Sequence, residues 1–436
     1  MRFTNEHNAP ERILFFHLDA IHDMDGVVQQ WHQPTKHGVA LRPERAYEGA
    51  MTLPVAIYPT PDGARLRCQY TCLNDKEMFP DLAAENAWYV DCLAESSDGM
   101  HWERVPVGEV TFRGSRDNNI IAANPDAELK VIMDPHDPDP QRRYKAIALR
   151  WPDHNRVIET SRRGRFFSSY TSPDGIHWSA PTDMAGFEET GDTSGLSYDE
   201  RRGLYLFTTR PRGYWLSDDY PKFYQRPIKK GVPDGRWVAL STSPDFVTWS
   251  PLDPILVRDA ADELGVDFYC GLPFPYGDLY VGWLRRHHHW HGTMDTELVW
   301  SRDCRRWQRS WYRRSFLGPG ELGEPDWCFG DVVNVKPIRR GDTLFIYYEG
   351  RQHVHGPHQI RERRGGRGRL GMDACMAVAT MRVDGFVSLE AGGMGGNLVT
   401  APLPFVSVPA SALSHNTHPA ILVAASMELV FHASIS

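Results

Sequence analysis

The sequence predicts an all-β fold, a five-bladed β-propeller with four-stranded blades and a short C-terminal tail. Three observations predict it. The 436 residues include 14 Trp, 17 Tyr and 19 Phe beside 37 Gly and 32 Pro, and aromatic strands interrupted by frequent turns are typical of repetitive β folds. One seven-residue motif recurs, and its copies are separated by about the length of one propeller blade. The composition therefore argues against a helical or doubly wound architecture.

The recurring motif is Ser-x-Asp-x-x-x-Trp, which we name the Ser-Asp box. It occurs at residues 96–102, 172–178, 243–249 and 301–307, and a degenerate copy, Asp-Gly-Phe, lies at 384–386. The aspartates of successive copies are 76, 71, 58 and 81 residues apart, a period too long for a solenoid. In each box we expect Ser and Asp to accept backbone N–H groups at a tight turn and Trp to cover the junction between neighbouring blades.

Each unit is predicted to hold four strands, with the box between the third and the fourth. The predicted strands are 51–58, 64–72, 87–94 and 101–105; 129–133, 143–151, 166–171 and 177–178; 193–198, 204–210, 237–242 and 248–249; 269–276, 278–285, 296–300 and 306–307; and 332–338, 342–349, 374–380 and 385–389. The domains are then a lead-in segment at 1–43, the propeller at 44–396 and a C-terminal tail at 397–436. Because the tail lacks a strand pattern, we expect the propeller to fold without it.

The charge balance and apolar pattern exclude several partners. Lys and Arg number 48 against 56 Asp and Glu, a net charge of −8, so no nucleic-acid partner is expected. No run of 18 apolar residues could span a bilayer, and the start of the chain lacks a secretory apolar segment, so a cytoplasmic location is expected. The arginine-rich run at 361–369 is interpreted as a solvated loop. The seven cysteines form no CxxC pair and are expected to be reduced, buried thiols. The oligomeric state is not predicted.

The functional face should lie opposite the boxes. Strands 1 and 2 of a blade are joined at one rim, so the start of strand 1 and the end of strand 2 meet at the other rim. An acidic residue recurs where each innermost strand begins: Glu48, Asp117, Asp192, Asp267 and Asp331. Converging carboxylates repel, so some have raised pKa values while others stay ionised, as cleavage of a glycosidic bond requires. We expect these five residues to be catalytic; capping of strand ends in ordinary turns is the alternative for each.

Neighbouring polar and aromatic residues are expected to bind substrate. Arginine forks and carboxylates suit the hydroxyl groups of a sugar or sugar acid, and aromatic rings offer stacking surfaces. The residues expected in this role are Asn118, Asn119, Arg210, Arg285, His288, Trp327, Glu349 and Arg351. Rim salt bridges and ordinary packing are the alternative reading for each.

A histidine-rich loop follows the second strand of the fourth unit. His287, His289 and His291 alternate and could face one way on an extended segment and ligate a metal. Neutral imidazoles contacting sugar hydroxyls are the other interpretation, and the one we prefer. We therefore expect neither a metal nor an organic cofactor.

The five units, the boxes on the outer hairpins and the acidic strand starts resemble the five-bladed propeller glycoside hydrolases, the invertases, levanases and arabinanases of families 32, 43, 68 and 117. The resemblance covers residues 44–389. It implies a nucleophile or base in blade one, a transition-state-stabilising aspartate in blade two and an acid in blade three, roles that would fall on Glu48, Asp117 and Asp192. This chain departs from the group: blade one has Glu for Asp, blade three has Asp for Glu, and the Trp-x-Asn-Asp-Pro-Asn and Glu-Cys-Pro motifs are absent.

The expected function is therefore hydrolysis of a glycosidic bond by paired carboxylates in the axial pocket of a propeller, with a carbohydrate as the substrate. One alternative is a glycoside phosphorylase of the family 130 kind, in which Arg150, Arg210 and Arg285 would hold phosphate. The other is a non-catalytic carbohydrate-binding propeller, which would lack two carboxylates within about 10 Å of each other.

Overall fold

The computed structural model describes most of the chain. The described residues are 2–4, 14–49, 51–73, 89–124, 129–150, 166–184, 187, 190–211, 236–310, 312–332, 335–355, 374–393, 395–400 and 430–433. The regular secondary structure of these residues is β-strand apart from two single-turn 3-10 helices, η1 (Ala46–Glu48) and η3 (Pro140–Arg142), so the all-β prediction is confirmed. No helix within these ranges is long and apolar enough to cross a membrane.

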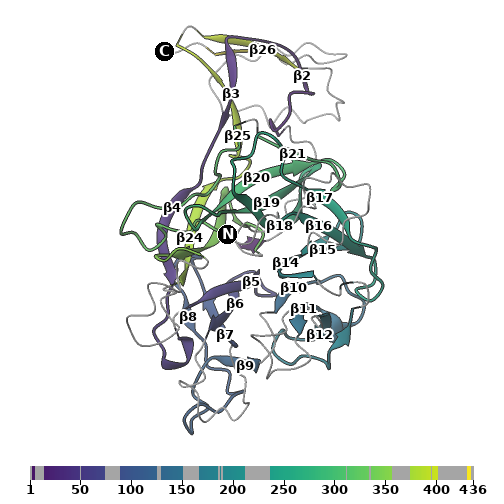
Figure 1. Ribbon diagram of the computed structural model, residues 1–436, viewed down its shortest axis with the longest axis vertical. Helices are drawn as coiled ribbons and strands as arrows, with labels where there is room; N and C mark the ends of the chain where they lie inside the picture. The colour runs from purple at the N-terminus through teal and green to yellow at the C-terminus, as the bar shows by residue number, and fades with distance from the viewer. Residues whose placement is uncertain are drawn as a thin grey trace. The chain divides into compact units, whose positions relative to one another are not determined.

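The chain forms two compact units. One contains residues 1–8 and 34–381, and the other contains residues 9–33 and 382–436. The first unit is the propeller, and its blades are antiparallel sheets whose first strands lie around a common centre (Figure 1). The prediction of five blades is confirmed.

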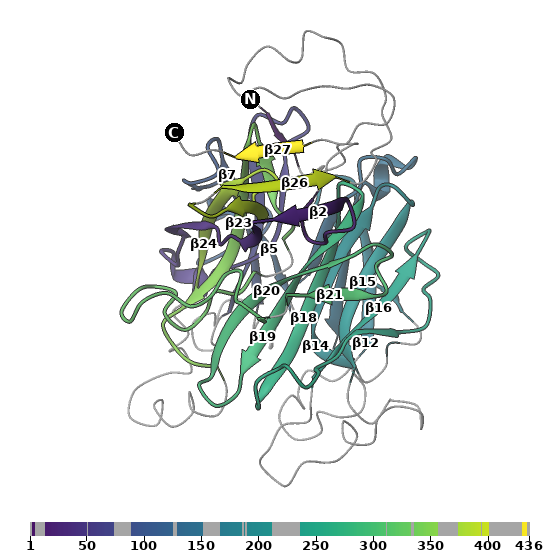
Figure 2. The same ribbon diagram turned by 90° about the horizontal axis from the view of Figure 1, so that it is seen from above.

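Four blades are built from consecutive strands. Blade 1 contains β5 (Leu53–Pro59), β6 (Leu66–Leu73), β7 (Tyr89–Ser96) and β8 (Glu103–Arg104), and β9 (Ile120–Asn124) also pairs with β7. Blade 2 contains β10 (Lys130–Met133), β11 (Tyr144–Arg150), β12 (Phe166–Ser172) and β13 (Thr182–Asp183). Blade 3 contains β14 (Thr190–Asp199), β15 (Leu204–Pro211), β16 (Val238–Ser243) and β17 (Asp253–Leu256). Blade 4 contains β18 (Val266–Tyr276), β19 (Leu279–His288), β20 (Thr293–Ser301) and β21 (Trp307–Arg309), whose long β18 and β19 run side by side in Figure 2.

Blade 5 joins the two ends of the propeller chain. Its strands are β22 (Ile338–Arg340), β23 (Thr343–Arg351), β24 (Ala374–Arg382) and, outermost, β4 (Thr35–Leu41); β1 (Phe3–Thr4) adds to the free edge of β22. Leu41 lies opposite Met376, and both are buried in one apolar cluster. The prediction of residues 385–389 as the fourth strand is wrong, because residues 387–391 form β25, which pairs with β3 (Val27–Trp31), and β4 pairs with β24 in its place. The segment at 1–43 is thus partly a component of the propeller.

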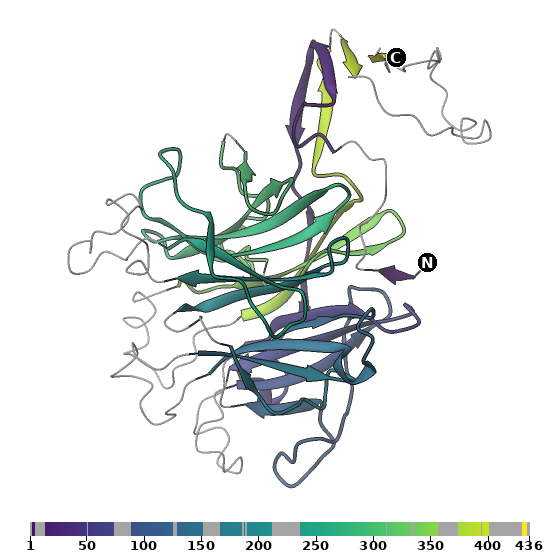
Figure 3. The same cartoon turned by 90° about the vertical axis from the view of Figure 1, so that its right-hand side faces the viewer.

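The second unit combines segments from both ends of the chain. β2 (Ile21–Asp25), β26 (Gly396–Thr400) and β27 (Val430–Ala433) form one sheet, and β3 (Val27–Trp31) pairs with β25 (Val387–Ala391). Figure 3 shows these N-terminal strands in purple against C-terminal strands in yellow-green. The tail therefore does contain strands, at 396–400 and 430–433. That the propeller folds without residues 397–436 stays a prediction.

The Ser-Asp boxes form the turns that the sequence predicts. Asp98 Oδ1 accepts the backbone N–H groups two and three residues later at 2.7 and 2.8 Å, and Ser96 Oγ accepts the N–H three residues later at 2.8 Å. The aspartates of the other three full boxes make the same two bonds. Trp102 packs edge-on against Tyr347 of blade 5, with ring centroids 5.6 Å apart, and so covers a junction between blades.

Replacing a box aspartate should lower stability in a pH-dependent way. Asp174 accepts the N–H groups of Ile176 and His177 at 2.8 and 2.9 Å, so Asp174→Ala should destabilise by about 1–2 kcal/mol at pH 7, since water replaces part of what is lost at this half-exposed turn. Burial opposes ionisation, but bonds from His177 and its neighbours hold the pKa of Asp174 at about 2. An aspartate whose pKa is lowered on folding stabilises the folded state at pH values above its ordinary pKa near 4. This stabilisation is lost as the pH falls towards 2. The difference in unfolding free energy between the two proteins should shrink over that range, and equal stability at pH 7 would contradict the role.

All seven cysteines are buried and free, as predicted. Burial raises the pKa of the Cys375 thiol to about 12. Cys375 is therefore a neutral thiol at neutral pH, and its side chain contributes to the packing of the core.

Candidate functional site

The innermost strand of blade 4 is kinked at Tyr269, on the rim opposite the boxes. Opposite β19, Phe268 pairs with Arg286 and Cys270 pairs with Arg285, so Tyr269 has no register partner in this ladder. A bulge of this kind re-aims a side chain, and bulges are common beside functional sites. The Tyr269 hydroxyl is 2.7 Å from Nε2 of His355, which fixes the direction of the ring.

Three arginines from two blades surround the Tyr269 ring. The guanidinium carbons of Arg210, at the end of β15, Arg236, just before β16, and Arg285, in β19, lie 5.2, 4.6 and 5.7 Å from the ring centroid. Such distances are those of cation–π contacts. We name Tyr269 and these three arginines the Tyr269 cluster. It concentrates positive charge and donors beside an aromatic ring, a combination that suits a hydroxyl-rich or anionic ligand.

Two carboxylates face each other where blade 5 begins. Asp331 and Glu349 exchange both backbone hydrogen bonds, at 3.3 and 2.8 Å, and so occupy directly opposite positions on the same face of the sheet. Both are buried, with 0% and 1% exposure. Like charges in such positions repel, and a buried pair that is retained despite this repulsion is a candidate functional site.

Two arginines compensate the carboxylate pair. Arg285 Nε and Nη2 donate to the two oxygens of Asp331 at 2.7 and 2.5 Å, and Arg351 Nε donates to Oε1 of Glu349. Burial raises the pKa of Glu349, and the negative charge of Asp331 raises it further against the opposite effect of Arg351. The two carboxyl groups therefore differ: Asp331 is held by a bidentate arginine, while Glu349 is biased towards its protonated form.

The carboxylate pair and the Tyr269 cluster are connected. Arg285 belongs to both, because its guanidinium group holds Asp331 and lies near the Tyr269 ring. Trp327 is half-buried and packs against the apolar cluster that contains Tyr269. Of the residues expected from sequence, Arg210, Arg285, Trp327, Asp331, Glu349 and Arg351 are thus brought together.

Asp267 and His287 lie next to the Tyr269 cluster. Asp267 is 3% exposed; its Oδ1 accepts the backbone N–H of Arg236 at 3.2 Å, and its Oδ2 is 3.8 Å from Nε of the same arginine. Burial raises the pKa of Asp267. Burial also lowers the pKa of His287 to about 3, and the charge of Arg236 adds to this effect. His287 is therefore a neutral imidazole at physiological pH.

His288 points to the other face of β19. Its Nε2 is 3.1 Å from Oδ1 of Asp295, and Asp295 also accepts two bonds from Arg286, at 2.9 and 2.5 Å. Burial opposes protonation of His288, but Asp295 outweighs it and the pKa of His288 is raised. Alternation along a strand sends neighbouring side chains to opposite faces. His288 thus lies in a buried ionic network of blade 4 and outside the cluster where sequence reasoning expected it.

Glu48 lies in a different environment from the one expected. It accepts bonds from Nε and Nη2 of Arg104 at 2.7 and 2.9 Å and from the Tyr70 hydroxyl at 2.6 Å. Although burial opposes ionisation, these bonds lower its pKa. Arg104 belongs to β8, an outer strand of blade 1. Glu48 is therefore held in a buried ion pair with an outer strand of blade 1, and the catalytic role expected for it stays a prediction.

The Asp117-Asn118-Asn119 segment is also placed elsewhere, because β9 pairs with β7 of blade 1 and does not begin blade 2. Asn118 and Asn119 are buried and donate to backbone carbonyl groups, at 2.8 Å for Val110 in the loop after β8 and at 2.7 Å for Leu93 in β7. Asp117 is exposed. These bonds give both asparagines structural roles. The side chains of Asp192 and Arg150 lie outside the described residues, and the role expected for each stays a prediction.

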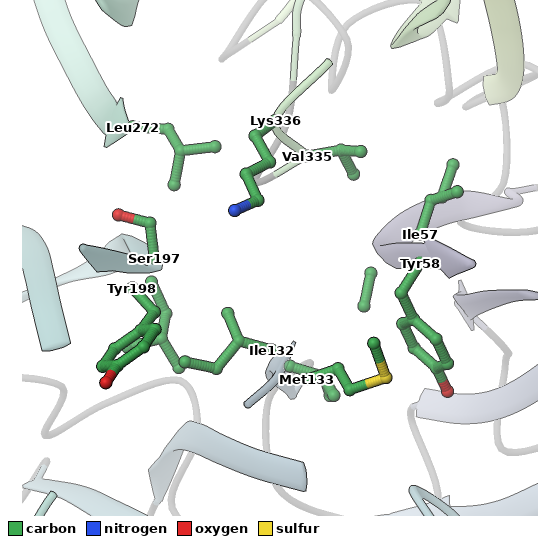
Figure 4. Close-up of a pocket in the computed structure, with 12 residues that line it drawn as sticks. Ile57, Tyr58, Ile132, Met133, Ser197, Tyr198, Leu272, Val335 and Lys336 are labelled. Atoms are coloured by element: carbon green, nitrogen blue, oxygen red, sulfur yellow. The ribbon is translucent and has the colours of Figure 1, made fainter. Parts of the chain in front are cut away.

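The axis is apolar at the hairpin rim. A cavity there is lined by the ends of the innermost strands, including Tyr58, Met133 and Tyr198, and Figure 4 shows the Lys336 side chain extending into it. Lys336 Nζ is 2.9 Å from Oε1 of Glu200. A largely aliphatic lining offers few partners for sugar hydroxyls, so the polar site lies at the opposite rim.

Comparison with known proteins supports the fold of this chain but does not assign its function. No protein-family model and no curated protein matches the sequence. Among solved structures, a protein described as a glycoside hydrolase matches with a TM-score of 0.50 and 14% identity over 80% of this chain and 92% of that one. The β-1,2-mannobiose phosphorylase of Listeria innocua matches at 0.46 and 14% over 79% and 94%, and the GH62 α-L-arabinofuranosidase catalytic domain of Coprinopsis cinerea at 0.43 and 10% over 81% and 98%. The chain thus has the five-bladed propeller fold of a solved glycoside hydrolase.

Sequence reasoning missed Tyr269, Arg236 and His355. Tyr269 stands two positions after an expected residue, Asp267, and that adjacency was an available signal. Its inclusion depends on a bulge, which the strand pattern does not indicate. Arg236 lies just before the third strand of blade 3, and His355 lies in the loop after β23. Both are distant from Tyr269 along the chain and contact it only in the folded structure.

Proposed function

We propose that this protein is a carbohydrate-active enzyme that cleaves a glycosidic bond at the rim where blades 4 and 5 meet. The observation that carries the proposal is the buried pair of Asp331 and Glu349, two opposed carboxylates in unequal electrostatic surroundings. Two carboxyl groups whose environments separate their protonation states are what acid-assisted glycosidic cleavage requires. The fold supports the proposal, since a solved glycoside hydrolase shares it.

The roles follow from the surroundings of each group. Glu349, whose pKa is raised, acts as the acid that protonates the departing glycosidic oxygen. Asp331, held by Arg285, stabilises the positive charge that develops on the sugar ring until water adds to the sugar carbon. Trp327, which is half-buried, offers a stacking surface, and Arg210 and Arg236 bind substrate oxygens.

The Tyr269 cluster also favours a second candidate, a glycoside phosphorylase. In such an enzyme phosphate, in place of water, attacks the sugar carbon after protonation of the leaving group. Arg210 and Arg236 lie on one tyrosine ring at 5.2 and 4.6 Å and could hold a phosphate dianion. Arg285, which also belongs to the cluster, is already committed to Asp331.

The test is turnover of a panel of aryl furanosides and pyranosides with and without inorganic phosphate. Release of the aryl alcohol without phosphate supports hydrolysis, and strict dependence on phosphate supports the phosphorylase. The panel includes uncharged sugars and sugar acids. Saturable binding of a sugar with no turnover in either condition would contradict both enzymatic activities and support the non-catalytic carbohydrate-binding propeller.

A further inference from the structure

Three potential metal ligands gather beside the Tyr269 cluster. Asp267, His287 and His289 each offer one ligand atom, and these atoms lie within 4.8 Å of one another. Asp267 and His287 are directly opposite in the β18–β19 ladder, and the backbone N–H of His289 donates to Gly265 O at 2.9 Å. Backbone pairing therefore sets the positions from which the three side chains extend.

Asp267 and His287 each have one polar atom that is poorly satisfied. Among the described residues, Oδ2 of Asp267 and Nε2 of His287 are buried without a hydrogen-bond partner. A buried polar atom left in this state costs free energy and calls for an explanation. The unsatisfied carboxylate oxygen of Asp267, directly opposite His287 in the ladder, is suited to a positively charged ligand.

The spacing of the two imidazoles fits a shared ion better than a shared proton. Nδ1 of His287 is 3.4 Å from Nδ1 of His289, whereas a good N–H hydrogen bond spans about 2.7–3.2 Å. Two nitrogens that each lie about 2.0–2.1 Å from a tetrahedral zinc ion are about 3.3–3.4 Å apart. The buried His287 ring packs edge-on against the rings of Tyr269 and His289, with centroids 5.8 and 5.0 Å apart, and the nitrogen that it presents to His289 is Nδ1.

We propose that Asp267, His287 and His289 bind one divalent first-row transition-metal ion such as Zn²⁺. Two imidazoles and one carboxylate are a set that such ions prefer, and three protein ligands leave coordination positions open to water or to a substrate oxygen. The site goes beyond the proposed function, because cleavage by Asp331 and Glu349 does not use it. His291, the third histidine of the alternating series, is exposed and is no part of it.

Arg236 opposes the ion and supplies a test. Its Nε lies 3.8 Å from Oδ2 of Asp267, and its charge repels a cation. When the ion binds, the carboxylate exchanges this arginine for the metal, while the guanidinium group keeps its contact with the Tyr269 ring at 4.6 Å. Arg236→Gln should therefore bind metal more tightly than the native chain, an effect that a purely structural trio would not produce.

The experiment is titration of the full chain with Zn²⁺ and Co²⁺ after treatment with a chelator and dialysis. We expect about one ion per chain by calorimetry and the visible absorption of Co²⁺ bound to nitrogen and oxygen ligands. His289→Ala should weaken binding at least about tenfold, and Asp267→Asn should act in the same direction. His291→Ala is the matched control, since it removes the same side chain from the same loop, and it should bind as the native chain does. Circular dichroism and thermal unfolding establish that each variant is folded.

The outcomes separate this proposal from the proposed function. Saturable binding that His289→Ala weakens and His291→Ala does not supports the site, even if no glycoside is turned over. No saturable binding by the native chain, or equal loss in the two histidine variants, overturns it. Turnover of glycosides by a chain that binds neither ion leaves the carboxylate pair intact and rejects the metal site.

Discussion

Glu349→Gln is expected to lower kcat at least about a hundredfold, the lower end of general acid contributions. Gln keeps the shape of the side chain and removes the proton that the leaving oxygen would receive. The raised pKa of Glu349 keeps the native group protonated above the ordinary range of a glutamate, and activity should fall as pH rises through that raised value. The variant should lose this alkaline decline, because it has no proton to release. The measurement is kcat and kcat/KM as functions of pH for both proteins.

A matched control is available in blade 1. Glu95 pairs with Arg67 at 2.9 Å and Arg65 at 3.2 Å, so Glu95→Gln also converts an ion-paired glutamate, but outside the site. It should keep its kcat and its pH profile. A folded Glu349→Gln protein with native kcat would show that the carboxylate pair is structural, and equal losses in the two variants would point to a general effect on folding.

The parts of the fold that sequence predicts are those coded locally. Each Ser-Asp box carries its own turn, since Asp98 and its counterparts bond to N–H groups only two and three residues away. Such short-range patterns need no knowledge of the rest of the chain. The four full Ser-Asp boxes therefore predict the positions of four outer hairpins and the spacing of the blades along the chain.

The parts that sequence did not predict depend on partners distant along the chain. β9 looks like the start of a new blade but pairs with β7, and this removed Asp117, Asn118 and Asn119 from the expected site. Asp331 was placed correctly at the start of blade 5, yet its partner Arg285 lies 46 residues away. The expectation that innermost strands begin with acidic residues pointed to Asp267 and Asp331. The electrostatic difference between Asp331 and Glu349 depends on burial and on neighbouring charges, which the sequence does not show.

Closure of the ring is the largest feature that local patterns could not reveal. Most residues of β4 are half-exposed or exposed, and its sequence, TKHGVAL, lacks the apolar alternation by which a strand is predicted. It nevertheless pairs with β24 over five register positions, from Leu41 to Thr35. Thr52 Oγ1 donates to Leu41 O at 3.0 Å, and Lys36 Nζ donates to Gly318 O and to Asp326 Oδ2, both at 2.7 Å.

Removal of residues 1–41 is therefore expected to abolish folding of the propeller, whereas removal of residues 1–33 is not. Several ladder bonds worth about 1 kcal/mol each, together with loss of buried Leu41 at about 2–5 kcal/mol, exceed about 5 kcal/mol. That is the whole stability of many domains, and the bare β24 edge would also invite aggregation. A chain that begins at residue 34 keeps β4 and loses β1 and the N-terminal strands of the second unit. Comparing it with a chain that begins at residue 42 assigns the effect to eight residues.

A chain that ends at Gly396 completes the comparison, because it loses 40 residues from the second unit and none from the propeller. Thermal unfolding and gel filtration should show a cooperative, monodisperse transition for the chains that begin at 34 and end at 396, and a collapsed or aggregated product for the chain that begins at 42. The reason is topological: the other blades are single continuous meanders, but blade 5 holds its shape only when segments from both ends of the propeller meet. A stable, cooperative chain lacking β4 would mean that the ring closes through other contacts, and loss of folding on truncation at Gly396 would mean that the second unit is part of the closure.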